Sequence, residues 1–285
     1  MLRTKAGRSS ALRLLDDRDI GEVLALCDRD PAVNVFVSSR VHEAGLELAR
    51  LGGQVWGYQP ASHLVSLCYV GANLVPVAAT PDAIAAFAGR ARLMGRRCSS
   101  IVGLAPAVLD LWDALRPYWG PPREIRGSQP VMEISEPPQV PPDPLVRRVR
   151  REELDILLPA SVAMFTEEVG VSPLGPDGGG AYRARVRELI DAGRAYARIE
   201  DGRVVFKAEI GSVTPHACQV QGVWVRPELR GRGLAEAGMA ALVNDALRRV
   251  APVISRYVND YNRPARAAYR RVGFTQTATF ASVLF

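Results

Sequence analysis

The 285-residue sequence predicts an α+β fold, in which helices flank a mixed sheet, and it predicts this fold twice along the chain. Two observations carry the prediction: segments with strand and helix periodicity alternate through the second half, and the first half repeats a similar order. A third observation divides the halves, because residues 135–144 contain five prolines and favour an extended spacer. We therefore expect one domain at 1–134, a Pro-rich linker at 135–144 and a second domain at 145–285.

The elements of the second half follow from its apolar periodicity and from its glycines and prolines. The pattern first predicts a strand, two helices separated by a Gly/Pro-rich loop from Gly170 to Gly180, and three consecutive strands. It then predicts a helix, a strand, a helix that begins after Asn262, and a last strand. In the same order, the predicted ranges are 145–149, 151–165, 181–192, 194–200, 203–212, 217–226, 234–249, 252–258, the Asn262 helix and 277–285.

The first half contains a similar order of predicted strands and helices, identified from the same signals. We expect a strand, a helix, three strands, a helix, a strand and a helix. Their predicted ranges are 11–15, 19–26, 54–58, 64–70, 73–78, 81–94, 99–103 and 106–116.

Charge and cysteine content restrict the function classes. Residues 143–285 carry 21 basic and 16 acidic side chains, whereas residues 1–142 carry 15 and 14. This excess suits a polyphosphate ligand but forms no basic stripe of the kind that binds nucleic acid. The four cysteines are scattered without metal-ligand spacing, so we expect reduced thiols and no metal.

Residues 1–15 contain no continuous apolar stretch and no segment reaches ~20 apolar residues, so we expect a cytoplasmic protein without a membrane partner.

The most informative segment is 223–235, which reads as a strand, a turn and a glycine-rich helix start. Val223, Trp224 and Val225 favour a strand, Pro227 ends it, and Leu234 begins a helical pattern. Gly231 and Gly233 allow close backbone approach to a ligand at a helix N-terminus, where free amides favour anions. Arg230 and Arg232 add two cations. The segment lacks the Lys-Ser/Thr of a P-loop and the third glycine of a dinucleotide fingerprint, so it predicts a different pyrophosphate site.

Two motifs carry a family resemblance over residues 145–285. Arg230-x-x-Gly233-x-Ala235 resembles the Q/R-x-x-G-x-G/A motif of the GNAT superfamily of acyl-CoA N-acyltransferases. About 25 residues later, the segment from Asn262 to Phe274 resembles the GNAT pattern N-x-x-A-x-x-x-Y-x-x-x-G-F, with Asn262 suited to an N-cap. The order and spacing of the two motifs agree with that family. The predicted element order also matches its fold.

The resemblance implies the following assignments. Acetyl-CoA is the cosubstrate, and residues 230–235 (Arg230, Gly231, Arg232, Gly233, Leu234 and Ala235) hold its pyrophosphate. The main chain of Val223 and Val225 and the side chain of Asn262 contact the pantetheine arm, and Trp224 and Asn259 are further cofactor-binding residues. Tyr269 lies near the thioester sulfur and protonates the leaving thiolate.

The general base departs from the family pattern. Many GNATs carry a glutamate on the strand that holds Gln219 and Gln221 here, and an amide cannot take the proton. Glu209, on the preceding strand, is our leading replacement, with His216, Glu167 and Glu168 as further candidates. The segment 167–180 lies where GNATs close over the acceptor, although a surface loop is the alternative.

The first half resembles a degenerate GNAT domain by element order alone. Where the pyrophosphate motif would stand, it has Thr80, Pro81 and Asp82, which predict an ordinary capped helix start without CoA binding. The sequence thus predicts an acetyl-CoA-dependent N-acetyltransferase that acts on a primary amine. The alternatives are a non-catalytic acyl-CoA sensor, motivated by Gln219 and Gln221, and an aminoacyl or peptidyl transferase with a basic groove.

Overall fold

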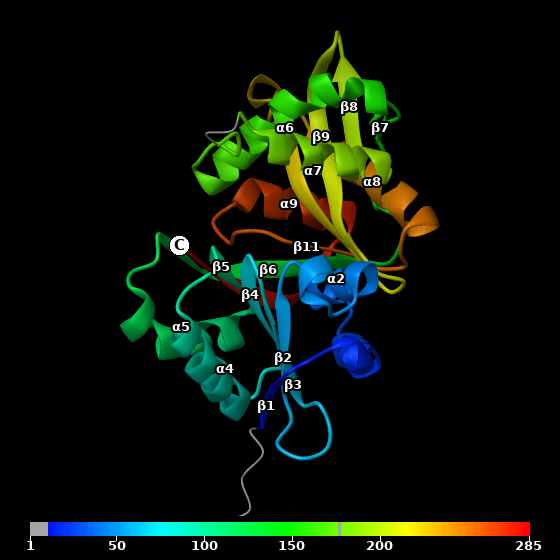
Figure 1. Ribbon diagram of the computed structural model, residues 1–285. Coiled ribbons are helices and arrows are strands. Elements are labelled where there is room, and N and C mark those ends of the chain that lie inside the picture. Colours follow the sequence, from blue (N-terminus) through cyan, green and yellow to red (C-terminus); the bar gives the residue numbers. More distant parts are fainter. Residues whose placement is uncertain (1–10, 176–177) are drawn as a thin grey trace, which may run out of the picture. The chain divides into compact units, whose positions relative to one another are not determined.

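The computed structural model describes residues 11–175 and 178–285, which belong to two compact units of the chain (Figure 1). One unit extends to Pro130 and also contains Ala278–Phe285, and the other is Val131–Thr277. Two parts of the sequence predictions lie outside the described residues. These are residues 1–10 of the segment inspected for targeting signals, and residues 176–177 of the predicted loop.

The first unit is a sheet with helices on both faces. Its strand order is β1-β2-β3-β4-β5-β12, in which β4 and β5 run parallel and the other described pairs run antiparallel. β6 (Glu124–Ile134) begins in this unit and β12 (Thr275–Leu284) ends in it. Its other elements are β1 (Leu12–Leu14), η1 (Asp17–Asp19), α1 (Ile20–Cys27), α2 (Val35–Ala44), α3 (Leu48–Leu51), β2 (Gln54–Tyr58), β3 (Ser66–Val70), β4 (Asn73–Val77), α4 (Pro81–Met94), β5 (Ser100–Leu104) and α5 (Ala105–Trp119).

Alternation along β2 divides the core of the first unit into two apolar clusters. Trp56 packs with Phe87 of α4 and Leu111 of α5. Its neighbour Val55 points to the opposite face and packs with α1 and α2 through residues such as Val23. The strand therefore stabilises helices on both of its faces.

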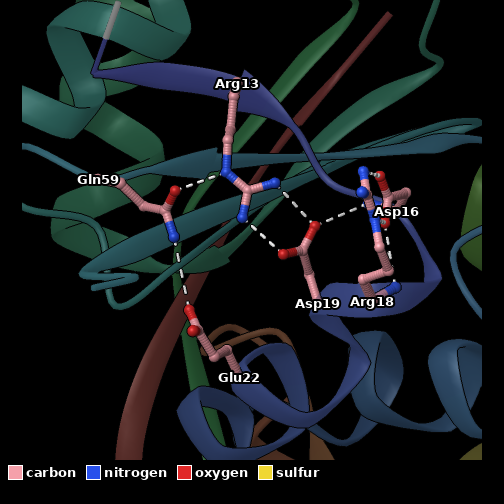
Figure 2. Close-up of polar contacts among 6 residues, drawn as sticks. All are labelled: Arg13, Asp16, Arg18, Asp19, Glu22 and Gln59. Atoms are coloured by element: carbon pink, nitrogen blue, oxygen red, sulfur yellow. Dashed lines mark hydrogen bonds and ion pairs between the residues drawn. The ribbon is translucent and has the colours of Figure 1, made fainter. Parts of the chain in front are cut away.

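A polar network fixes the connection from β1 to α1 (Figure 2). Arg13 donates from Nη1 to Asp19 Oδ2 at 2.8 Å and from Nε to Gln59 at 2.5 Å. The Asp16 amide donates to the same Asp19 carboxylate, while the Asp16 carboxylate accepts from the Arg18 amide and caps η1. The hydrogen bonds from Arg13 lower the pKa of Asp19. These residues hold the start of the helix in place.

The second unit contains the residues predicted for the site and has the strand order β6-β11-β10-β9-β8-β7. β10 and β11 run parallel, and the other described pairs run antiparallel. Its elements are β7 (Arg147–Arg148), η2 (Arg151–Glu153), α6 (Leu154–Val169), α7 (Gly180–Asp191), β8 (Ala195–Glu200), β9 (Arg203–Val213), β10 (Cys218–Val225), η3 (Pro227–Leu229), α8 (Leu234–Arg249), β11 (Ile254–Tyr257) and α9 (Arg263–Val272).

Helices cover both faces of this sheet as well. α8 and α9 pack on the face that presents Phe206 and Ile210. A Cβ on Gly238 of α8 would lie 2.7 Å from the Phe206 ring, so this glycine lets the helix approach the strand closely. α6 and α7 cross the other face of β8 and β9 (Figure 1), where Leu157 and Leu189 pack on Ala195.

The two units share one order of elements. Each has a strand, two or three helices (α1, α2 and the short α3 in the first unit, α6 and α7 in the second), three antiparallel strands, a helix, a strand parallel to the third, and another helix. The strand that completes the first sheet is β12, from the end of the chain, and the strand that completes the second is β6, from the end of the first half. The predicted α+β class, with a mixed sheet and flanking helices in both halves, is confirmed.

The structure adds elements that the sequence patterns did not predict. α2 begins Val35-Phe-Val-Ser-Ser, a composition with low helix propensity, and it forms because its apolar side chains pack against the sheet. α3 and the long strand β6 were also not predicted, and β7 is shorter than the predicted strand at 145–149.

Residues 135–144 make specific contacts in the second unit. The Gln139 amide donates to the Val272 carbonyl at 2.9 Å, and the Asp143 amide donates to the Ala237 carbonyl at the same distance. The Asp143 carboxylate forms an ion pair with Arg198 at 2.8 Å. The segment is therefore packed into the second unit at these points, while the predicted domain boundaries at 134 and 145 stay a prediction.

Candidate functional site

The site is a cavity of about 650 Å³ that lies within the second unit, at the point where β10 and β11 separate. The two strands pair only at Cys218 with Ile254 and at Gln219 with Ser255. Immediately afterwards β10 has a register irregularity, and a second one surrounds Gly222, whose φ is +59°. The backbone from Val220 onward thus faces the cavity rather than a neighbouring parallel strand. Both walls of the opening are strands whose main-chain groups can bind an extended ligand.

The mouth of the cavity is the turn between β10 and α8. Gly231 and Gly233 have φ values of +75° and +76°, and a Cβ on either would meet no atom within 4 Å. The glycines are therefore required by backbone conformation, and they leave open space beside the first amides of a sixteen-residue helix. This geometry and the nearby arginine fit a pyrophosphate. Gly233 is the N-cap of α8 and has no side chain to satisfy those amides.

Arg230 is held in place by two hydrogen bonds of different kinds. Its Nε donates to the Val225 carbonyl at 3.0 Å, and its Nη2 donates to Glu167 at 2.7 Å. Glu167, in the last turn of α6, also accepts from the Trp224 indole at 3.2 Å. The arginine and the carboxylate are each about half exposed, so the pair is in contact with solvent and an anionic ligand can compete for Arg230.

The far wall of the cavity includes α9. Asn262 caps this helix by accepting from the Ala265 amide at 3.2 Å, as the sequence predicted. Tyr269 is 3% exposed and lines the cavity. Burial raises the pKa of Tyr269, Arg256 opposes this shift, and Glu168 adds to it. The phenol is therefore protonated at neutral pH, which is the form that can donate a proton.

Glu209 belongs to a buried polar cluster on β9 and β10. Its carboxylate accepts from Lys207 at 2.8 Å and from the Gln221 amide at 3.1 Å. Lys207 is 1% exposed, so the ion pair is shielded from water. A Cβ on Gly222 would lie 3.0 Å from the Glu209 carboxyl carbon, which places the carboxylate directly behind the irregularity in β10. Gln221 lines the cavity, whereas Glu209 does not.

Most of the residues predicted for this site come together around the one cavity. Those that line it are Val223, Trp224, Val225, Arg230, Gly231, Gly233, Leu234, Ala235, Asn259, Asn262 and Tyr269. Arg232 is exposed and outside the lining. Of the further base candidates, Glu167 and Glu168 line the cavity, whereas His216 lies exposed in the turn between β9 and β10.

Sequence reasoning missed Arg256 and Met164. Arg256 lies on β11 and Met164 on α6, and both line the cavity. A charged residue between predicted strand residues, in the segment that forms Ile254–Tyr257, was the available signal for Arg256. Met164 carries no such signal, because methionine is common at apolar helix positions.

Two further observations concern the chain as a whole. The four cysteines are buried and unpaired, and burial raises the pKa of Cys27 and Cys218 to about 12. Among residues 11–175 and 178–285, none of the helices combines the length and the apolar character that crossing a membrane requires.

Comparisons with known proteins agree with this geometry. Residues 166–274 match the model of the acetyltransferase (GNAT) family, and residues 53–157 match a domain of unknown function (DUF4081). The sequence matches no curated protein.

Solved structures share the fold over nearly the whole chain. A GNAT-family acetyltransferase from Colwellia psychrerythraea is 12% identical, with 96% of this chain and 99% of that chain covered and a TM-score of 0.58. A GCN5-related N-acetyltransferase from Sphaerobacter thermophilus is 18% identical, with 95% and 93% covered and a TM-score of 0.58. A tandem GNAT protein from the clavulanic acid biosynthesis pathway is 15% identical, with 96% and 98% covered and a TM-score of 0.55. The match to the acetyltransferase (GNAT) family is therefore carried by residues 166–274, and the solved structures show a shared fold over nearly the whole chain.

Proposed function

We propose that this protein is an acetyl-CoA-dependent N-acetyltransferase that acts on a primary amine. The observation that carries the proposal is a single cavity that extends from the Gly231–Gly233 turn to Tyr269, between strands that separate after two paired positions. The turn suits a pyrophosphate, the free edge of β10 suits an extended pantetheine arm, and the phenol suits a thiolate leaving group. The absence of nucleic-acid and membrane partners and the cytoplasmic location stay predictions.

In the proposed reaction a neutral amine attacks the thioester carbonyl. A C–N bond forms, the C–S bond breaks, the amine loses one proton to water, and Tyr269 gives its proton to the departing thiolate. The raised pKa of Tyr269 keeps that proton available at neutral pH, and the phenol is restored from solvent after each turnover. Alignment of the two substrates in one cavity supplies a further part of the rate.

The predicted base Glu209 has a restricted role in this geometry. Both of its oxygens are engaged, by Lys207 and by Gln221, and the carboxylate does not line the cavity. A proton from the amine would reach it only through an intervening water. An α-amine, with a pKa near ~7.7–8.0, needs little help from a base, whereas a lysine-type amine at ~10.4 needs more. The arrangement therefore favours acceptors whose amine is already partly neutral.

A binding and transfer experiment tests the proposal. Calorimetry first measures CoA binding to the purified protein. Labelled acetyl-CoA is then incubated with the protein and a lysate of its host, and products are separated by mass. Transfer above a Tyr269→Phe control is the expected result, and label in the macromolecular or the low-mass fraction identifies the acceptor class.

The second candidate, an acyl-CoA sensor, is favoured by the engaged Glu209 and by the two glutamines Gln219 and Gln221 on β10. It predicts tight CoA binding without transfer to any acceptor. Absence of CoA binding would reject both candidates.

A further inference from the structure

Arg256 is a charged side chain in the cavity that has no role in the proposed reaction. It is 8% exposed and lines the cavity on β11, one residue beyond the last pair between β10 and β11. Its Nε and Nη1 are buried without a hydrogen-bond partner among the described residues. Its Nη2 makes a long contact of 3.4 Å with the Tyr257 carbonyl. A guanidinium with five donors is thus nearly unsatisfied at this point.

The ring of Tyr269 offsets only part of the free-energy cost of burying the guanidinium. The guanidinium carbon lies 3.8 Å from the ring centroid, which is a favourable cation–π geometry. Stacking of this kind uses the face of the guanidinium and leaves the N–H groups in its plane available. Burying a cationic group is costly unless it is paired or hydrogen-bonded, so an anion or ligand atoms would offset the remaining cost.

The nearby carboxylates are largely committed elsewhere. Glu209 is bound by Lys207 and Gln221, Glu167 by Arg230 and Trp224, and Glu236 by Arg271. Glu168 also lines the cavity and affects Tyr269 electrostatically. Among the described residues of the cavity wall, none accepts from Nε or Nη1.

We propose that Arg256 binds a carboxylate of the substrate beside the reacting thioester. The planar fork of donors matches a carboxylate in a bidentate arrangement, and the low exposure of the site strengthens such a pair. The inference rests on the proposed function. It narrows the substrate class to a carboxylate-bearing one, with the carboxylate supplied either by the amine acceptor, as in an amino acid, or by a dicarboxylic acyl group on CoA.

The test compares wild type with Arg256→Gln, Arg256→Lys and the control Arg270→Gln. Arg270 is exposed on α9 and outside the cavity, so its variant removes the same charge from the same unit. In the acceptor arm, CoA release from acetyl-CoA is followed with a thiol reagent for phenylalanine against 2-phenylethylamine, and for tryptophan against tryptamine. The buried cysteines give this assay a low background. In the acyl arm, calorimetry compares the Kd of succinyl-CoA with that of acetyl-CoA.

The expected result is a preference of about ten- to a hundred-fold for the carboxylate-bearing member in one of the two arms. That arm identifies the source of the carboxylate. The preference should fall to near unity in Arg256→Gln, be partly kept in Arg256→Lys, and be unchanged in Arg270→Gln.

Three results would overturn the inference. One is equal rates for the two acceptors of each pair and equal Kd values for the two acyl-CoAs, while CoA binding is intact. This result would leave the proposed function standing. Another is a preference that survives Arg256→Gln. The third is an equal loss for both members in Arg256→Gln, restored by Arg256→Lys, which would show that Arg256 serves only to support Tyr269 or to balance Glu168. A protein that binds no CoA would reject the proposed function and this inference together.

Discussion

The backbone at the mouth of the cavity makes a sharp prediction for Gly233→Glu, because a matched control exists elsewhere in the same unit. Gly233 has a φ of +76° and Gly202, in the turn between β8 and β9, has a φ of +68°, and an added Cβ would meet no atom within 4 Å at either position. A left-handed conformation costs a residue with a Cβ roughly 1–2 kcal/mol. Gly233→Glu and Gly202→Glu should therefore lower the melting temperature by a similar few degrees.

CoA binding should separate the two variants. A carboxylate about 5 Å from one phosphate charge, at an effective dielectric of about 20, is repelled by roughly 3 kcal/mol. This corresponds to a loss in affinity of more than about 100-fold, before steric exclusion from the turn is added. Calorimetry with CoA at low salt should show this loss for Gly233→Glu and wild-type affinity for Gly202→Glu. Unchanged binding by Gly233→Glu, or an equal loss in both variants, would refute the assignment of the turn as the pyrophosphate site.

Three other predictions concern protons. Tyr269→Phe should lower kcat by about 10²–10⁴-fold without changing the Kd for CoA, and an unchanged turnover rate would remove the phenol from the mechanism. If Glu209 is the base, the Lys207→Met/Glu209→Gln double variant should lose activity most strongly near neutral pH. This variant leaves no unpaired buried charge. An activity with the pH dependence of the wild type would exclude Glu209 as the base. Glu153 has a pKa lowered from 4.5 to about 2, mainly by hydrogen bonds from Arg147. Because the folded-state pKa is the lower one, its contribution is present above about pH 4.5 and disappears as the pH falls towards 2. Urea unfolding should show Glu153→Gln about 1–3 kcal/mol less stable at pH 7, with a gap that closes in this range; a constant gap would contradict the reasoning.

The sequence predicted the fold well where periodicity and helix caps agree. The helix at 81–94 was predicted with its bounds, and Thr80 caps it by accepting from the Ala83 amide. Prediction failed where long-range packing decides the conformation. The Val-Phe-Val start of α2 resembles a strand locally, and its burial against the first sheet favours the helix. Likewise, β6 becomes a strand because it pairs with β11, more than a hundred residues later in the chain.

The site was predictable to the extent that local motifs describe it. The glycines of the turn and the cap of α9 are both properties of short segments, and the structure places them on one cavity. The hydrogen bonding of the Glu209 carboxylate was not predictable, since the contact with Gln221 depends on the register of two strands and on the irregularity at Gly222. Arg256 was missed for a related reason: its neighbour Tyr269 comes from another element, and its proposed partner is not part of the chain.

The two halves differ at the helix start where the phosphate site of the second half is proposed. Both contain a strand, a helix and a second strand that pairs in parallel with the first at only two described positions. In the first half the helix start carries Thr80 and Asp82, so the amides have a side-chain acceptor and a carboxylate repels anions. In the second half Gly233 offers neither, and the amides of α8 are left for a ligand. Gly233→Thr should therefore resemble the first half, with a partly satisfied helix start and weaker CoA binding, although the left-handed backbone at this position costs it some of the stability that a cap provides. A capping side chain and a carboxylate at the equivalent helix start therefore distinguish the first half from the half with the proposed phosphate site.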